Sequence, residues 1–265
     1  MFKLSPSHQN ILLRLTLLLF LLVMTSARSV LAVDPTIDPP PETAEEAETN
    51  KLHNTLLREG NYEQLDREMN QIQFEYEQGI RDDISLLHLS YAFYDNDAGL
   101  EAKFNDWVTA YPQSYSARVA RGIFLRRIAR TARGTAYISE TQEQQLTTME
   151  IYLERAMDDL QESFSLTKKP LLTHYNILCV ARLLGERELG DNTLKVANEI
   201  DPKNFIARYK YMGMLQTRWG GSLQEMQEFR QEVEKVGFSS DLVQLFDDLI
   251  SDEIVWLANL EQGNR

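Results

Sequence analysis

Apolar residues along most of the chain recur at steps of three and four, a spacing that gathers them on one face of a helix. The sharpest example begins after Ser222, where Glu225 completes a capping-box pattern, and reaches Gly237, a residue suited to a helix end. Strand-like alternation is nearly absent from Ala44 onward. The pattern predicts an all-α fold, and its two strongest helical stripes are Leu223, Met226, Phe229, Val233, Val236 and Leu146, Met149, Leu153, Ala156, Leu160, Phe164.

Short breaks rich in helix-ending residues separate the predicted helices, at 60–61, 95–98, 185–186, 201–202 and 220–221. Because short connections make consecutive helices run antiparallel, these breaks predict a stack of about five helical hairpins within residues 44–265. A long helix is expected over about 114–130, and a C-terminal helix over about 240–260. A domain seam, if the chain has one, is expected near 134–145.

The N-terminal segment has the composition of a secretory signal. Residues 1–32 carry three bases and no acid, and the apolar run 15–24 is about half of the roughly 20 residues that a spanning helix needs. Small side chains at the positions that a signal peptidase reads predict cleavage after Ala32, and hence a periplasmic or secreted protein. An uncleaved signal that anchors the chain to the membrane is the alternative. Residues 33–43 contain four prolines and predict an extended linker.

The segment Leu194–Pro202 resembles the end of the second helix of a tetratricopeptide repeat. Gly185 then falls at the turn between the two helices of that unit. In a second register, Pro112 closes one unit and Gly122 takes the small-residue position of the next helix. The resemblance implies a tetratricopeptide-like stack of antiparallel helical hairpins. Its repeats are irregular, because the spacing between Pro112 and Pro202 is not a multiple of the 34-residue repeat.

A second resemblance concerns the run from Leu215 to Phe229, with its core Arg-Trp-Gly-Gly-Ser at 218–222. This run resembles the signature of an uncharacterised bacterial helical family, domain-of-unknown-function family 4034. The upstream elements fall in the order that the family would show, so the similarity covers roughly residues 100–230. The resemblance implies a tetratricopeptide-like helical module without an established activity, and it supplies no catalytic residues.

Composition and charge narrow the classes of function. With 43% hydrophobic and 25% charged residues, the chain has the composition of a globular protein. Its formal charge of −13, which removal of residues 1–32 would change to −16, repels phosphate backbones and argues against nucleic-acid binding. The single cysteine, Cys179, lies in an apolar run and is expected to be a buried thiol outside any internal disulfide.

No pattern in the sequence indicates a catalytic, cofactor-binding or metal-ligating residue. His53, His88 and His174 fall on separate predicted helices, without a second histidine or a glutamate at ligand spacing. The acidic run 42–48 is interpreted as solvated residues of a first helical turn. The sequence contains no phosphate loop, nucleophile elbow or dinucleotide-binding turn. We therefore expect a protein that is not an enzyme and needs no cofactor.

Arginine is concentrated in one place against this acidic background. Six arginines lie between Arg118 and Arg133, and at about 100° per residue most of them spread over about half of a helix circumference. Such a half-face can bind a carboxylate- or phosphate-bearing partner, which makes Arg126, Arg130 and Arg133 candidate contacts. The alternative is internal pairing with acids of a neighbouring helix, such as Asp158, Asp159 and Glu162.

Arg218 and Trp219 are the second pair of candidate contacts, because they precede two glycines that allow a flexible turn. Packing of the Trp219 ring over the hairpin is the alternative. Together these features predict an exported adaptor or scaffold of the bacterial cell envelope that binds a protein or peptide partner. Two other functions stay open: an envelope hydrolase or lyase with a helical cleft, and a membrane-tethered assembly factor.

Overall fold

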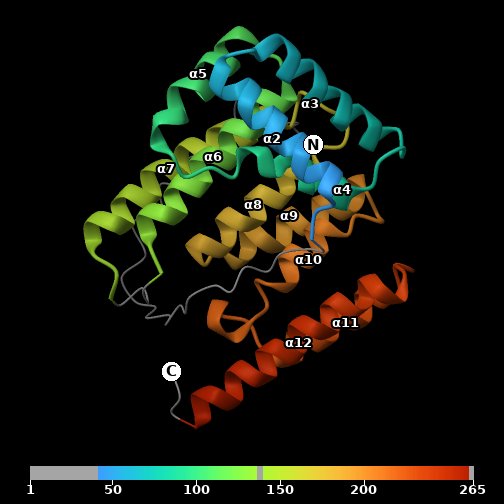
Figure 1. The fold of residues 1–265 in the computed structure, drawn as a ribbon. Coiled ribbons are helices and arrows are strands. Elements are labelled where there is room, and N and C mark those ends of the chain that lie inside the picture. The colour runs from blue at the N-terminus through green and yellow to red at the C-terminus, as the bar shows by residue number, and fades with distance from the viewer. Residues whose placement is uncertain (1–40, 136–139, 263–265) are drawn as a thin grey trace, which may run out of the picture.

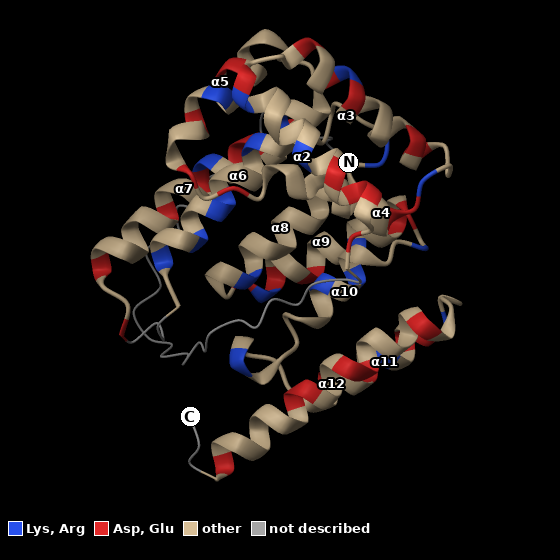
Figure 2. Cartoon of the chain, viewed as in Figure 1, with Lys and Arg blue, Asp and Glu red and all other residues tan. Residues whose placement is uncertain are grey.

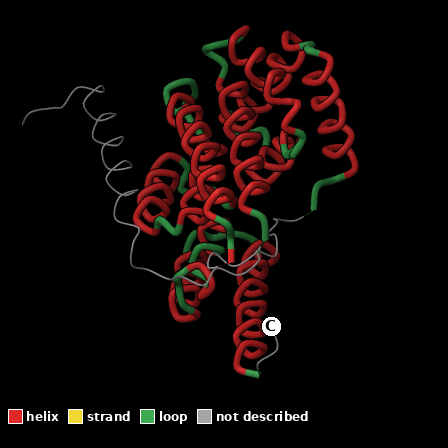
Figure 3. The backbone as a smooth tube through the Cα atoms, turned by 90° about the vertical axis from the view of Figure 1, so that its left-hand side faces the viewer, coloured by secondary structure: helices red, strands yellow, loops and turns green. Residues whose placement is uncertain are grey.

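The computed structural model describes residues 41–135 and 140–262, and the regular elements in these ranges are all helical (Figure 1). Figure 3, turned by 90°, shows the same ranges as helices joined by loops. The all-α prediction is therefore confirmed. The predicted signal segment and most of the predicted linker lie outside the described residues.

The helices follow one another in pairs with short connections. The first pair is α2 (Ala44–Glu59) and α3 (Tyr62–Glu77). In the second, α4 (Asp83–Leu89) and η1 (Ser90–Phe93) are joined through η2 (Ala98–Leu100) to α5 (Glu101–Ala110). The rest are α6 (Tyr115–Arg133), α7 (Glu143–Ser163), α8 (Leu171–Leu184), α9 (Arg187–Ile200), α10 (Ile206–Met212), η4 (Thr217–Trp219), α11 (Leu223–Glu234) and α12 (Ser240–Glu261).

Contacts between successive helices are compatible with the tetratricopeptide-like stack. α2 contacts α3, α6 contacts α7, α8 contacts α9, and α11 contacts α12. The seam expected near 134–145 coincides with the connection between α6 and α7, two helices that pack closely against each other. Residues 136–139 of that connection lie outside the described ranges.

Several helix ends follow the signals in the sequence. Gly60 and Gly185 end α2 and α8 in the left-handed conformation, which costs glycine little. Ser222 begins α11, and its hydroxyl accepts a hydrogen bond from the Glu225 amide at 3.2 Å. The long central helix starts one residue after its cap, Ser114, and reaches Arg133, three residues beyond the predicted end.

Helix α6 lies at the centre of the core and packs against α3, α5, α7 and α8. A Cβ atom added at Gly122 would lie 3.0 Å from Leu160 Cδ2 of α7, so glycine permits the close approach of these two helices. The ring of Phe124 stacks on Phe104 of α5, with centroids 4.5 Å apart. Cys179 of α8 is buried, as the sequence predicts.

A buried carboxylate joins the N-terminal helices to the C-terminal part of the chain. Asp83 of α4 accepts hydrogen bonds from the backbone amides of Phe205 and Ile206, the latter at 2.9 Å. These amides lie at the start of α10, where unpaired N–H groups favour a negative charge. Burial nevertheless raises the pKa of Asp83 to about 6, because it outweighs the stabilising hydrogen bonds.

This raised pKa predicts a stability difference between the wild type and the Asp83→Asn variant that changes with pH. The folded protein holds the Asp83 proton more tightly than the unfolded chain does, so this contribution to stability is complete below about pH 4 and is lost as the pH rises through 6. Between roughly pH 4.5 and pH 8, the free energy of unfolding of the wild type should therefore fall by about 2 kcal/mol relative to that of the Asp83→Asn variant, which has no charge at this position. Urea unfolding of both proteins at several pH values measures this, and a difference that stays constant would contradict the prediction.

Candidate functional site

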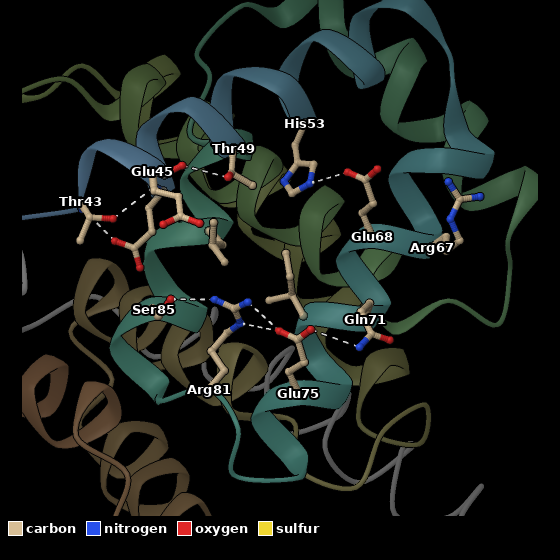
Figure 4. A pocket seen from close by; sticks show the side chains of 13 residues that line it. Thr43, Glu45, Thr49, His53, Arg67, Glu68, Gln71, Glu75, Arg81 and Ser85 are labelled. Carbon is tan, nitrogen blue, oxygen red and sulfur yellow. Dashed lines mark hydrogen bonds and ion pairs between the residues drawn. The ribbon is translucent and has the colours of Figure 1, made fainter.

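A groove of about 560 Å³ lies between α2, α3 and α4 (Figure 4). One wall comes from α2 and its cap, with Thr43, Glu45, Glu46, Thr49 and His53. The facing wall comes from α3, with Arg67, Glu68, Gln71 and Glu75. Arg81 and Ser85 close one end, and the buried side chains of Ile72 and Leu89 provide an apolar floor.

The sequence brings these side chains to the groove by helical spacing. On α2, Glu45, Thr49 and His53 follow one another at steps of four, which places them on the same side of the helix. On α3, Glu68 and Glu75 are seven residues apart and therefore lie two turns apart on one face. The left-handed turn at Gly60 then sets the two faces opposite each other.

A histidine–carboxylate pair crosses the groove from α2 to α3. His53 Nε2 lies 3.1 Å from Glu68 Oε2, and the histidine is only 1% exposed. Burial lowers the pKa of His53, although Glu68 opposes this shift, so the ring is neutral at neutral pH. Because a carboxylate only accepts, Nε2 carries the proton and donates a hydrogen bond to Glu68. Nδ1 is then a buried acceptor, and no residue in the described part of the chain donates a hydrogen bond to it.

A second histidine–carboxylate pair lies at the N-terminal end of α2. Glu46 Oε2 lies 3.0 Å from His88 Nδ1 of α4 and accepts a hydrogen bond from the Thr43 amide at 2.8 Å. Burial opposes ionisation of Glu46, but hydrogen bonds from Thr43, Ser85 and His88 outweigh it and hold its pKa below the usual value. Glu46 is therefore a fixed negative charge in the wall of the groove.

The closed end of the groove is an ion pair with well-defined geometry. The Arg81 guanidinium donates to Glu75 Oε2 through Nη2 at 2.6 Å and to Ser85 Oγ through Nη1 at 3.0 Å. The Glu75 carboxylate therefore compensates most of the positive charge of Arg81 within the protein. Hydrogen bonding from Arg81 also holds the pKa of Glu75 below its usual value.

The lining carries more negative than positive charge. Four carboxylates, Glu45, Glu46, Glu68 and Glu75, face two guanidinium groups, Arg67 and Arg81. Glu45 and Arg67 are exposed, and neither side chain makes a hydrogen bond or ion pair within the described part of the chain. The lining of the groove is therefore net negative, with Glu45 unpaired on one wall and Arg67 exposed on the other.

Two of the arginines of α6 are paired internally, as one of the two interpretations of the sequence expects. The buried carboxylate of Asp159 on α7 accepts from Arg121 at 2.6 and 2.7 Å and from Arg118 at 3.2 Å. Arg118 also pairs with Glu162 at 2.8 Å. These contacts join α6 to α7 by charge-assisted hydrogen bonds.

Two of the three predicted contact residues of α6 are buried. Arg126 is buried, donates from Nε to Asn176 at 2.9 Å, and lies over the ring of Tyr94. Arg133 is also buried and donates to the carbonyl of Gly134 at 3.3 Å. Arg130 is half-buried. In this conformation the three side chains offer little surface to a partner, and their role in binding stays a prediction.

Arg218 and Trp219 are likewise buried, in η4. The guanidinium of Arg218 lies 3.4 Å from Glu253 of α12 and over the ring of Trp256. The ring of Trp219 packs under the guanidinium of Arg182 from α8. These two residues thus connect α8, η4 and α12, in line with the packing interpretation, and a role in partner binding again stays a prediction.

Sequence inspection missed the groove itself. From the sequence alone the acidic run 42–48 is expected to be solvated, whereas Glu46 is half-buried and bonded to His88. The four-residue steps from Glu45 to His53 were the available signal, since they gather polar residues on one helical face. What they face depends on α3 and α4, and spacing along one helix does not predict that.

The described part of the chain contains neither a metal-binding cluster nor a helix suited to crossing a membrane. Across residues 41–135 and 140–262, no three or more His, Cys, Asp or Glu side chains are grouped so that they could hold a metal ion. Within the same ranges, no helix has both the length and the apolar composition that crossing a membrane requires.

Comparison with known proteins gave one match. A family model described as a domain of unknown function (DUF4034) matches residues 50–189, which run from α2 into the start of α9 and include one wall and the closed end of the groove. No curated protein and no solved structure matches the chain.

Proposed function

The chain belongs to the DUF4034 family, a domain of unknown function, and from that premise we propose that it is an exported protein-interaction module of the cell envelope. The proposed binding site is the groove between α2, α3 and α4, which would hold an extended segment of a protein partner. Export rests on the signal-like composition of residues 1–32.

The observation that carries this proposal is the construction of the groove. Its volume of about 560 Å³ is within the range of ligand sites, roughly 300–1,000 Å³. Its polar walls are held rigid by the His53–Glu68, His88–Glu46 and Arg81–Glu75 contacts. The buried floor at Ile72 and Leu89 supplies apolar area. Prearranged polar groups around an apolar floor bind a partner with little loss of side-chain entropy.

Helix pairs support the same proposal. Stacked helical hairpins build extended surfaces, and recognition of a peptide segment is a common use of such surfaces. The groove lies on the first two pairs of the described chain, so it would form one part of such a surface.

Photocrosslinking from the groove tests this function. With a benzophenone amino acid at Gln71, which is exposed and lines the groove, we expect one or a few envelope proteins to be crosslinked. The same amino acid at Glu154, exposed on α7, is the matched control and should not capture them. Equal capture from both positions, or none from Gln71, would reject the groove as the binding site.

Charge reversal at Arg126 and Arg133 is a poor test of partner binding. Both side chains are buried, so a carboxylate at either position would place an uncompensated charge inside the protein and destabilise the fold. A loss of partner capture would then report unfolding instead of a lost contact.

Turnover of cell-wall or glycan substrates by the purified protein would favour the hydrolase or lyase alternative.

A further inference from the structure

We infer that the partner segment presents a lysine or arginine side chain to the groove, where Glu45, Glu68 and the free nitrogen of His53 receive its charged N–H groups. This inference rests on the proposed function and specifies the chemistry of the partner. It follows from three separate observations on the lining of the groove.

The first observation is the balance of charge. Arg81 and Glu75 compensate each other, so the three remaining carboxylates face only one exposed guanidinium, that of Arg67. A cationic side chain would gain from Glu45 and Glu68, whereas a carboxylate would meet the same residues as like charges. The charge of the walls therefore favours a basic segment over an acidic one.

The second observation is the unpartnered nitrogen of His53. The histidine is 1% exposed, lines the groove, and projects from α2 into the space between the walls (Figure 4). Its Nε2 donates to Glu68, so its Nδ1 accepts, and a buried acceptor without a donor is costly. Ammonium and guanidinium groups consist of donors only. They would satisfy Nδ1, which a carboxylate ligand cannot do.

The third observation is the apolar floor. Ile72 and Leu89 are buried beneath the polar walls. Lysine and arginine have an aliphatic stem that packs on apolar surface while the charged end reaches polar groups. A floor of this kind next to carboxylates fits such a side chain better than it fits a small inorganic cation, which would use the carboxylates alone.

The surface charge elsewhere on the molecule makes a matched control available. Figure 2 shows acidic residues on many helices, including α7, so acidity alone does not distinguish the groove. Glu150 and Glu154 of α7 are exposed and lie outside the groove. Removing these two charges changes the net charge as much as removing Glu45 and Glu68 does.

The experiment measures binding of a short end-capped glycine–serine peptide that carries a few lysines, by fluorescence anisotropy at low salt. We expect acetylation of the lysines to weaken binding about tenfold or more. The Glu45→Gln/Glu68→Gln variant should lose affinity for the lysine peptide by a similar factor, while the Glu150→Gln/Glu154→Gln control keeps it. Circular dichroism and thermal unfolding of both variants establish that the fold is intact.

The outcomes separate this inference from the proposed function. Equal binding of lysine, acetyl-lysine and glutamate peptides, or no loss in the groove variant, would overturn the inference and leave crosslinking from Gln71 as the test of function. If spermidine binds as tightly as the peptide and displaces it, the groove is a site for small free amines, and the assignment to a protein segment fails. If neither the peptides bind nor Gln71 captures a protein, both proposals are wrong.

Discussion

Replacing Glu253 with glutamine is expected to lower the free energy of unfolding by about 3–5 kcal/mol, because it leaves the buried guanidinium of Arg218 without its counter-charge. Glu253 is completely buried, its Oε2 lies 3.4 Å from Arg218 Nη2, and its Oε1 accepts from the Thr217 amide at 2.8 Å. Both bonds join α12 to η4. The isosteric glutamine keeps an acceptor for Thr217 but removes the charge, so the cost comes mainly from the uncompensated Arg218.

Urea unfolding at neutral pH, followed by circular dichroism, measures this loss. Asp252, the exposed neighbour of Glu253, is the matched control, and Asp252→Asn should change stability by no more than about 0.5 kcal/mol. The double variant Arg218→Met/Glu253→Leu removes both charges and should recover much of the loss. A Glu253→Gln variant as stable as Asp252→Asn would show that the ion pair contributes nothing to holding α12 in place.

Features that one stretch of chain encodes were predictable from the sequence. The cap at Ser222, the turn at Gly185 and the helix end before Pro202 each depend on a few neighbouring residues, and each is confirmed. Burial of Cys179 followed from its apolar neighbours. The pairing of Arg118 and Arg121 with Asp159 was one of two interpretations, since a helix and its successor in a hairpin must lie side by side.

Features that depend on the packing of several helices were not predictable. Glu46 and His88 are 42 residues apart, and their contact requires α4 to lie beside the start of α2. Arg126 belongs to a helix surrounded by others, so a basic half-face that would be solvated on an isolated helix is largely buried here. Periodicity gives the face of a helix on which a residue lies but does not show what covers that face. For this reason the sequence points to arginines that are buried in the structure, and not to the groove.

Gly221→Ala is the second substitution with a large expected effect, and its cause is steric. A Cβ atom at Gly221 would lie 2.1 Å from the Leu215 carbonyl oxygen and 2.4 Å from its carbon. These are backbone atoms, so the clash can be relieved only by moving the loop. We expect a loss of about 3 kcal/mol or more, as for severe overpacking.

The neighbouring Gly220 provides the control for Gly221. Gly220 needs glycine for its backbone angle, whereas Gly221 needs glycine because there is no space for a Cβ atom. Gly220 has a φ of +89° but open space around its Cβ position, so Gly220→Ala should cost only about 1–2 kcal/mol of backbone strain.

The loop that Gly221→Ala displaces carries Thr217, whose amide bonds to Glu253. The two variants should therefore be non-additive: Gly221→Ala combined with Glu253→Gln should cost clearly less than the two single losses together. Simple additivity would mean that the loop and α12 are held independently, and a Gly221→Ala loss no larger than that of Gly220→Ala would contradict the steric explanation.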